Sequence, residues 1–411
     1  MEMMVCSPGR KMAAASLAPL EFDPYAYQVH EDPYPVYARL RAEAPAYRNE
    51  ALGFWALSRH ADVLAGFRDW QHFSNRNGVS LDLDAFHADA ETTMSFLAMD
   101  PPRHDRLRAL VSRGFTPRRV ASIEPHIRAL SVRYLEAFAD SGSCDFIRDF
   151  AGKLPMDVVS EMLGVPAADR ATLRGWADLV VHREEGVQGL PPAAAQSALR
   201  MLHYFTEMLA ERRAGAPRGP DDLTSALIAA EAEGDRLSDR EIIGFLFLMV
   251  VAGNETTTKL LGNALYWLWR NPAQRDRLRA DPGLVPRWVE ETLRYDNSTQ
   301  ALARVVASDL ELHDQKLREG DRVVLLVGSA NRDERVFPEP DRFDLARDTS
   351  ASLAFGQGVH FCLGASLARL EGRVALEEFW KRIPDYEIDP AGLVRVHSVN
   401  VRGFAALPIG F

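Results

Sequence analysis

The sequence predicts a mainly α-helical fold with a minor β part, and three features of the chain lead to this fold class. Helical patterns dominate residues 32–213. One uninterrupted helix of about 32 residues is expected between Ser238 and Asn271. Strand-like segments are short and are confined to residues 54–57 and to the chain after residue 300. A chain with this balance of elements has a core built chiefly from packed helices.

The first half of the chain alternates helical patterns with clear breaks. Asp32-Pro33 opens a helix that runs to about Arg41, because proline is tolerated in a first helical turn. Residues 74–99 have no clean period and indicate a long loop, a kind of segment that is usually functional or mobile. A basic helix begins after Pro101-Pro102, and further helices reach about residue 213. Residues 214–220 are rich in glycine and proline and predict a surface loop.

The second half begins with the long helix. Ser238 followed by Glu241 is a capping-box pattern, and nothing in the sequence stops the helix before Asn271-Pro272. The first half of this helix is apolar on every face, so we expect it to be buried throughout. The remaining predicted elements are helices at 284–296 and 363–381 and strands at 302–306, 322–327, 394–396 and 404–409.

Composition excludes several classes of protein. The 411 residues carry 48 basic and 58 acidic side chains, a net charge of −10, and an acidic chain is a poor nucleic-acid binder. Three scattered cysteines, Cys6, Cys144 and Cys362, are too few for a disulfide framework or a zinc cluster. We expect Cys6 and Cys144 to be ordinary small side chains.

The sequence predicts neither a signal peptide nor a membrane-spanning helix. Residues 1–20 lack a continuous apolar segment of the signal-peptide kind, and the longest apolar run, residues 242–253, is 12 residues long. A spanning helix needs about 20. The sequence therefore predicts a cytoplasmic protein with no membrane span, in which residues 1–20 form a disordered extension and residues 21–411 form one domain.

The most informative segment of the chain is Phe355–Gly364, which reads FGQGVHFCLG. Gly356 and Gly358 permit left-handed backbone angles and a close approach of the main chain to a flat ligand. Cys362 lies where this loop becomes a helix, and a helix N-terminus favours the thiolate, the form that binds metal.

This segment resembles the haem-binding loop of the cytochrome P450 superfamily of haem-thiolate monooxygenases. The resemblance implies one large cytochrome P450-like domain, with the long central helix lying over haem b. It makes Cys362 the ligand of the haem iron, flanked by Gly356 and Gly364. It also places His360 near a haem propionate and Phe355 beside the sulfur.

Polar residues interrupt the long helix just after its apolar half, at Asn254, Glu255 and Thr256. Burying such groups unpaired costs about 1–3 kcal/mol each, which a purely structural helix would avoid. Leu248, Ala252 and Thr256 share one face at i, i+4 spacing and are expected to line one surface. By resemblance, Ala252 approaches the cofactor, and Glu255 and Thr256 form the acid–alcohol pair that relays protons during oxygen activation.

Further residues match the family in chain order. Glu291 and Arg294, three apart on one helix, resemble the Glu-x-x-Arg element, with Arg342 as the third member of a structural triad. The sequence departs from the family after Tyr295, because the family often has a proline a few residues on and this chain has Asp296 to Thr299 there. The resemblance implies that three side chains contact the haem propionates, namely His104, Arg108 and Arg304.

The resemblance implies an enzyme that inserts one oxygen atom from O2 into a small, mostly apolar organic substrate, most often as a hydroxylation. No Gly-x-Gly-x-x-Gly motif follows a predicted strand, so the electrons are expected from NAD(P)H through a ferredoxin and its reductase. A haem-thiolate peroxygenase and a non-catalytic haem- or ligand-binding protein are the alternatives. The protein is expected to be a monomer.

A concentration of arginines in two segments predicts a docking face for an acidic ferredoxin near Cys362. These residues are Arg103, Arg106, Arg113, Arg118, Arg119, Arg369 and Arg373.

Overall fold

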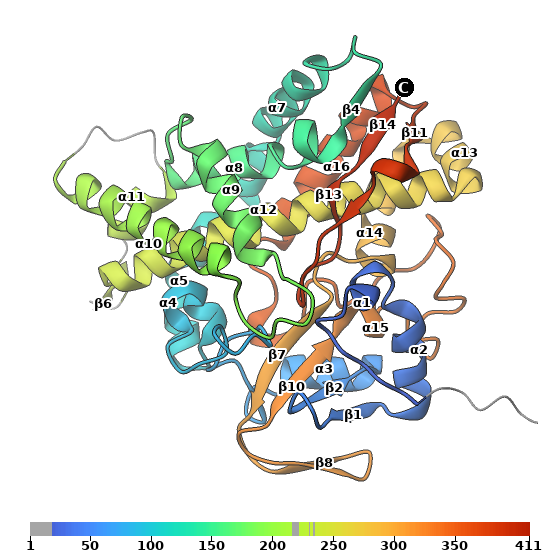
Figure 1. Cartoon of the computed structure of the whole chain (residues 1–411). Helices are drawn as coiled ribbons and strands as arrows, with labels where there is room; N and C mark the ends of the chain where they lie inside the picture. Colours follow the sequence, from blue (N-terminus) through green and yellow to red (C-terminus); the bar gives the residue numbers. More distant parts are fainter. Residues whose placement is uncertain (1–18, 216–221, 230, 233–234) are drawn as a thin grey trace, which may run out of the picture.

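The computed structural model describes residues 19–215, 222–229, 231–232 and 235–411, and it has a helical region and a region built around a β-sheet (Figure 1). The long helix α12 (Asp239–Arg270) crosses the helical region. The predicted mainly α-helical fold with a minor β part is confirmed. The predicted N-terminal extension, up to residue 18, and residues 216–220 of the predicted loop lie outside the described residues.

A five-stranded sheet holds most of the β structure. Its order is β1-β2-β10-β7-β3, and β10 runs parallel to β2 and antiparallel to β7. The predicted strand at 54–57 is β2, and the predicted strands at 302–306 and 322–327 correspond to β7 and β10. The strand bounds are β1 Ala46–Asn49, β2 Phe54–Leu57, β3 Phe73–Ser74, β7 Ala301–Val306 and β10 Arg322–Leu326.

Smaller strands form hairpins and a second sheet. β4 (Ser143–Asp145), far away in the sequence, pairs with β14 (Pro408–Gly410), which also pairs with β11 (Glu387–Ile388). The other strands pair within hairpins: β5 Glu231–Ala232 with β6 Asp235–Arg236, β8 Leu310–Leu312 with β9 Gln315–Leu317, and β12 Val394–Arg395 with β13 Phe404–Ala406.

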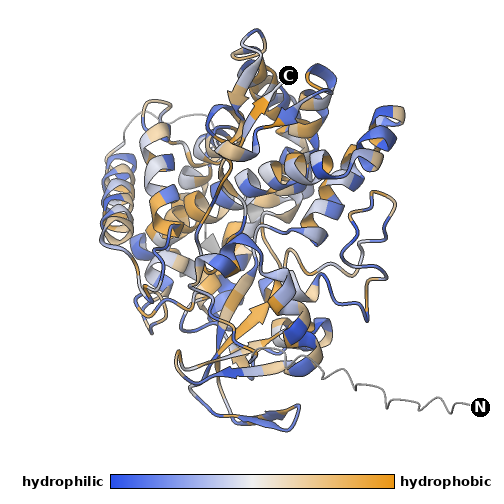
Figure 2. Ribbon diagram, turned by 45° about the vertical axis from the view of Figure 1, so that its right-hand side comes forward, coloured by the Kyte–Doolittle hydropathy of each residue, from blue (hydrophilic) through white to orange (hydrophobic). Residues whose placement is uncertain are grey.

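Short helices accompany the sheet, and longer helices build the other region. Those near the sheet are α1 Tyr27–Glu31, α2 Tyr34–Glu43, α3 His60–Arg68 and α15 Val327–Ala330. The helical region contains α4 Glu91–Met94, α5 Arg103–Ser112, α6 Pro117–Ser122, α7 Glu124–Glu136, α8 Leu154–Leu163, α9 Arg170–Val181, α10 Pro192–Arg213, α11 Leu223–Ala229, α13 Pro272–Ala280, α14 Val285–Tyr295 and α16 Ala365–Arg382. Hydrophilic residues dominate the outer helices, and hydrophobic residues gather in the interior (Figure 2).

Helix α12 begins and ends where the sequence predicts. The Ser238 hydroxyl accepts a hydrogen bond from the backbone N–H of Glu241, and the Glu241 carboxylate accepts one from the N–H of Ser238 at 2.8 Å. The helix packs against α4, α8, α9, α10, α14 and α16, so it lies in the middle of the core. The expectation that its apolar half is buried on every face is wrong for one face. Leu248 and Thr256 are half-buried and Ala252 is exposed, so these three residues line an accessible surface inside the helical region.

An ion pair and backbone hydrogen bonds connect three loops that lie far apart in the sequence. Asp82, in the long loop before α4, forms a fully buried ion pair of 2.6 Å with Arg183, which follows α9. In the same two loops, the N–H of Leu83 donates to the carbonyl of Gln188 at 3.2 Å. The N–H of Arg183 donates to the carbonyl of His397 at 2.8 Å, which adds the C-terminal loop. We call this set of contacts the three-loop closure.

Among the described residues, no helix has both the length and the apolar content needed to cross a membrane.

Candidate functional site

Local backbone geometry places Cys362 at the start of α16. Gly356 and Gly358 adopt φ values of +67° and +71°, which L side chains rarely adopt. A Cβ on Gly358 would lie 2.7 Å from the Phe67 carbonyl oxygen, so only glycine fits this turn. The N–H of Cys362 then donates to the carbonyl of Phe355 at 2.9 Å, which closes the loop just before the helix.

Burial and nearby donor groups have opposite effects on the pKa of the Cys362 thiol. Its side chain is accessible, yet protein atoms surround it on most sides, so burial raises the pKa of the thiol. The N–H groups of Gly364 and Ala365 donate to the sulfur and lower that pKa, as do the nearby guanidinium groups of Arg108 and Arg369. In the protein without a bound metal, burial raises the pKa of Cys362 more than the N–H groups at the start of α16 lower it. A positive metal centre at the sulfur would reverse this balance.

The three side chains predicted to contact the propionates come together beside this loop with His360, which was predicted to lie near a propionate. The rings of His104 and His360 lie 4.3 Å apart between centroids. Burial, followed by the charges of Arg304, His104 and Arg108, holds the pKa of His360 far below its usual value, so this imidazole is neutral at pH 7. Arg304 is 2% exposed, and burial lowers the pKa of its guanidinium to about 10.

This cluster contains more donors than acceptors. Nε2 of His104 has no hydrogen-bond partner among the described residues, and neither ring nitrogen of His360 makes a well-aligned hydrogen bond, although the Met99 carbonyl lies nearby. The buried guanidinium of Arg304 donates to one carbonyl, that of Ala303, at 2.7 Å. Buried donors and a buried cation in this number fit a ligand that carries carboxylates. With a thiol and a glycine turn beside them, the residues present fit haem and its two propionates.

The polar segment of α12 separates into two sets of contacts. The Thr256 hydroxyl donates to the carbonyl of Ala252 at 2.7 Å, one helical turn earlier. Glu255 is 1% exposed, and its carboxylate lies 3.2 Å from the Lys259 ammonium. Asn254 donates to the same carboxylate at 3.3 Å. The two side chains of the predicted acid–alcohol pair therefore have separate partners in this structure.

Asp178 of α9 adds a second carboxyl to the Glu255 cluster. It lies in hydrogen-bond contact with Glu255, and burial together with the Glu255 carboxylate raises the pKa of Asp178 to about 8. Burial also opposes the ionisation of Glu255, but Lys259, the hydrogen bonds from Asp178 and Lys259, and Arg174 outweigh it and lower the Glu255 pKa. Neither Asp178 nor Lys259 was predicted from the sequence. The i, i+4 spacing of Glu255 and Lys259 was a readable signal, whereas no local pattern connects Asp178 with α12.

The structural triad needs one correction. Glu291 and Arg294 form the predicted pair, with two contacts of 2.8 Å, and both are buried. The side chain of Arg342 is 56% exposed and pairs with Glu339 instead, contributing only its backbone carbonyl to Arg294. The second arginine on Glu291 is Arg347, whose Nε lies 3.3 Å from the carboxylate. Arg342 was predicted because its motif resembles the family's element, but chain geometry brings the next arginine to the pair.

Asp296 lies in the segment that differs from the family pattern, and its side chain is an anchoring point that holds three parts of the chain together. Its buried carboxylate accepts hydrogen bonds from the Tyr34 hydroxyl at 2.5 Å, the Arg402 guanidinium at 2.7 Å and the Trp267 indole at 2.7 Å. Burial opposes the charge of Asp296, but Arg402, Arg395 and these hydrogen bonds lower its pKa to about 2. An ionised carboxylate thus connects the N-terminal helices, α12 and the C-terminal loop.

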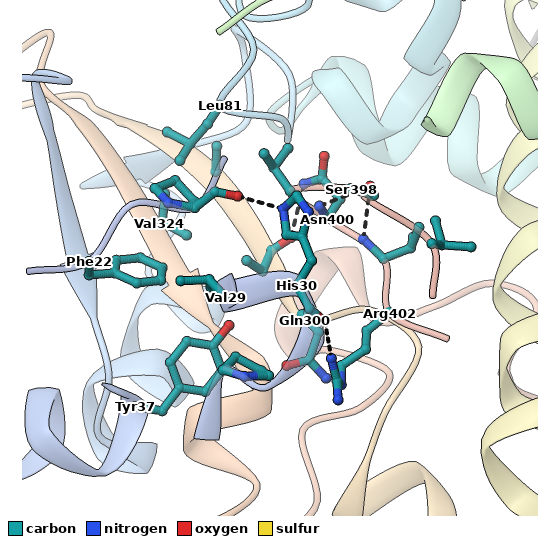
Figure 3. A pocket seen from close by; sticks show the side chains of 17 residues that line it. Phe22, Val29, His30, Tyr37, Leu81, Gln300, Val324, Ser398, Asn400 and Arg402 are labelled. Carbon is teal, nitrogen blue, oxygen red and sulfur yellow. Dashed lines mark hydrogen bonds between the residues drawn. The ribbon is translucent and has the colours of Figure 1, made fainter. Parts of the chain in front are cut away.

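A small cavity lies beside this anchoring point (Figure 3). Figure 3 shows Phe22 and Tyr37 on its apolar side and Asn400 and Arg402 on its polar side, with Gln300 and other residues between them. Its volume is about 30 Å³, which is room for one or two water molecules and not for an organic substrate. An organic substrate therefore needs a different surface, and the accessible face of α12 is the candidate.

The predicted basic docking face is largely neutralised by ion pairs. The acidic partners are Glu91 for Arg103 at 3.0 Å, Glu241 for Arg106 at 2.6 Å, Glu290 for Arg369 at 2.6 Å and Glu124 for Arg373 at 2.6 Å. The side chain of Arg113 lies outside the described residues. Arg118 and Arg119 are exposed on α6, which packs beside α16. Among the described side chains of this set, the docking hypothesis therefore depends on Arg118 and Arg119.

Comparisons with known proteins show which family the chain resembles. A family model described as Cytochrome P450 matches residues 194–282 and 283–382. The chain is 56% identical to cytochrome P450 123 of Mycobacterium tuberculosis, over 95% of this chain and 96% of that protein. It is 38% identical to vitamin D(3) 25-hydroxylase of Pseudonocardia autotrophica, over 97% and 98% of the two chains. The solved structure of CYP109E1 from Bacillus megaterium in complex with testosterone matches with a TM-score of 0.86 at 32% identity, covering 93% of this chain and 98% of that one.

Proposed function

The chain belongs to the cytochrome P450 family and is a haem-dependent monooxygenase, and from this premise we propose that it hydroxylates a mostly apolar organic substrate. One observation carries the assignment of the site. Cys362 lies at the start of α16 beside His104, Arg108, Arg304 and His360, and three buried ring nitrogens of the two histidines make no well-aligned hydrogen bond among the described residues.

We assign the haem contacts to this cluster. Cys362 is the thiolate ligand of the iron, and the N–H groups of Gly364 and Ala365 stabilise its negative charge. Arg304 and Arg108 supply cations for the propionates, and the neutral rings of His104 and His360 supply hydrogen bonds. When bound, haem with a thiolate ligand supplies the reductive activation of O2.

The accessible face of α12 lies at the reaction site in this proposal. Ala252 leaves room for a flat ligand against the helix, and the Thr256 hydroxyl one turn later can accept a proton and donate another. Glu255 is the ionisable group next in the chain to Thr256, and its carboxylate accepts a proton and passes it toward the hydroxyl. Because Glu255 and Thr256 do not share a hydrogen bond, a water molecule is needed between them.

The substrate is proposed to be a fused-ring or similarly bulky apolar compound. Two observations support this class. Two of the relatives are described as a vitamin D(3) 25-hydroxylase and as a protein in complex with testosterone. The face of α12 that is accessible carries Leu248 and Ala252, which offer no charged group to a substrate.

The electrons are proposed to come from NAD(P)H through a ferredoxin and its reductase, with Arg118 and Arg119 on the docking face. We further propose that the protein works as a monomer in the cytoplasm, which sedimentation and cell fractionation would test.

The thiolate assignment is tested by the spectrum of the reduced, CO-bound protein. The wild type should show the far red-shifted Soret band of thiolate ligation, and Cys362→His should lose it. Cys144→Ala is the matched control, because Cys144 lies in β4 away from the site and should not affect the band. A red-shifted band that persists in Cys362→His would contradict the assignment. Titration with vitamin D3 and testosterone, followed by the spin-state change of the iron, tests the substrate class.

A further inference from the structure

The buried carboxylate of Glu255 is held by a network that includes Lys259 of α12 and Asp178 of α9. Lys259, one turn further along the helix, is 4% exposed and forms the 3.2 Å ion pair. Its stem is fixed against the backbone, because a Cβ on Gly403 would lie 2.5 Å from the Cβ of Lys259. A buried ammonium in such a position holds one charge state and one orientation of its partner.

The network reaches α9 through Asp178. Two carboxyl groups in hydrogen-bond contact must share a proton, because two carboxylates at that separation repel each other. Asp178 keeps accessible surface while Glu255 is buried, so the shared proton can exchange with solvent only on the Asp178 side. The groups that act on Asp178 are Glu255 and Lys259 from α12 and Arg174 from its own helix. The helices α8 and α10, which also pack on α9, provide none of its principal interactions.

We propose that Asp178 and Glu255 form a carboxyl pair that shares one proton, that Lys259 holds this pair in place, and that protons for Thr256 enter the protein through Asp178. This inference rests on the proposed function, because it specifies the source of the protons that the oxygen reaction consumes. Asp178 and Lys259 are positioning residues, since neither contacts the Thr256 hydroxyl.

The proposed step is a proton transfer and changes no oxidation state. The Oδ–H bond of Asp178 breaks as an O–H bond forms on the Glu255 carboxylate. Glu255 then releases that proton through water toward the Thr256 hydroxyl, and Asp178 regains a proton from solvent. Each passage moves one proton inward, and both carboxyl groups return to their starting states.

The first test measures the shared proton directly and does not depend on turnover. Glu371 is a second buried acid with a raised pKa, so the comparison is made in a Glu371→Gln background. Infrared difference spectra of this resting protein, recorded while the pH is raised, should show the band of a protonated carboxyl that disappears at mildly alkaline pH. Asp178→Asn should remove this band, because the amide keeps the shape and the hydrogen bond but cannot ionise. Glu211→Gln on α10 is the matched control and should leave the band in place. A band that persists unchanged in Asp178→Asn would overturn the proposal.

The second test follows the pH profile of substrate turnover. We expect the wild-type rate to fall as the pH rises through the mildly alkaline range and Asp178→Asn to be about tenfold slower with no such fall. Asp178→Glu should restore the pH dependence, which a merely structural role would not require. A wild-type profile in Asp178→Asn would overturn the proposal. If the wild type made no product with any redox system, the proposed function would fail, and the infrared titration would still decide the carboxyl pair.

Discussion

Thr256 illustrates how much one hydroxyl group contributes at this site. Its hydrogen bond to Ala252 is local to the helix, so Thr256→Ala should fold and bind haem normally, since alanine is the better helix former. Without the hydroxyl, we expect product per NAD(P)H to fall about tenfold, less than the ~10²–10⁴ attributed to directly positioned acids, because water partly replaces the group. The lost product should be balanced by hydrogen peroxide. Thr256→Ser keeps the hydroxyl and should retain coupling, and equal coupling in all three proteins would refute the assignment.

Arg347 and Arg342 offer a second test at the scale of single residues. Arg347→Ala leaves the buried Glu291 with one cation and removes hydrogen bonds to the carbonyls of Glu339 and Arg342, so we expect a loss of about 2–3 kcal/mol of unfolding free energy. Arg342→Ala removes an exposed side chain and should change stability by less than about 0.5 kcal/mol. Denaturant unfolding of both variants measures the difference. The reverse order would restore Arg342 as the third member of the triad.

The candidate site was predictable where its residues are local in sequence. The loop around Cys362 could be read because its glycines, histidine and cysteine lie within ten residues and their spacing carries the geometry. Arg347 and Asp178 could not be identified in this way. Their partners lie 56 and 77 residues away in the chain (347 − 291 and 255 − 178), and only folding brings them together. Local pattern therefore predicts the Cys362 loop, the resemblance to a family adds the distant propionate contacts, and tertiary packing determines the groups that support them.

At the scale of elements, the contact between α12 and α16 contains a buried acid that the proposed function does not use. Glu371 of α16 is 2% exposed and hydrogen bonds to Thr257 of α12. Burial raises the pKa of Glu371 to about 8, while the Thr257 hydrogen bond lowers it slightly. The side chain is therefore protonated at neutral pH and joins the two helices as a neutral group.

This acid predicts a stability that decreases as the pH rises. The folded pKa of Glu371 lies above its unfolded value of 4.5, so its contribution is fully present below pH 4.5 and is lost between there and about pH 8. The loss approaches about 1.4 kcal/mol for each pH unit in that window. Glu371→Gln should remove this dependence and raise the melting temperature at pH 8 more than at pH 5. Parallel pH profiles for the two proteins would show that the pKa of Glu371 is not raised in the folded state.

The elements themselves were predicted best where a local signal defines them. The capping box fixed the start of α12, and Asn271-Pro272 fixed its end. Short strands such as β3 and β4 were missed, because two or three residues carry no period and pair with segments far along the chain. The i, i+4 spacing predicted that Leu248, Ala252 and Thr256 share one face of α12, but only the packing of its neighbours determines that this face stays uncovered.

At the scale of the whole molecule, most surface arginines near α16 already have acidic partners, so few are left to attract a ferredoxin. We expect Arg118→Glu with Arg119→Glu to lower the rate of reduction by a ferredoxin about tenfold at low salt and to remove most of its salt dependence. Arg200→Glu on α10, which packs on α9 and α12, is the matched control and should have no effect. Stopped-flow reduction at several ionic strengths measures both. No change in the double variant would show that docking uses another face.

The three-loop closure has a consequence for the time course of ligand binding. Asp82 and Arg183 are buried as a pair, so separating their loops exposes two charges and breaks several backbone hydrogen bonds at once. If a substrate enters between these loops, the loops must separate before it binds, and the rate of that separation does not depend on substrate concentration. The observed rate constant of binding would then stop increasing with substrate concentration and reach a plateau equal to the opening rate. Neutralising both charges, in Asp82→Asn with Arg183→Gln, would raise the plateau and leave the final absorbance change similar. The buried ion pair would thus set how quickly the protein exchanges its ligand, rather than how tightly it holds it.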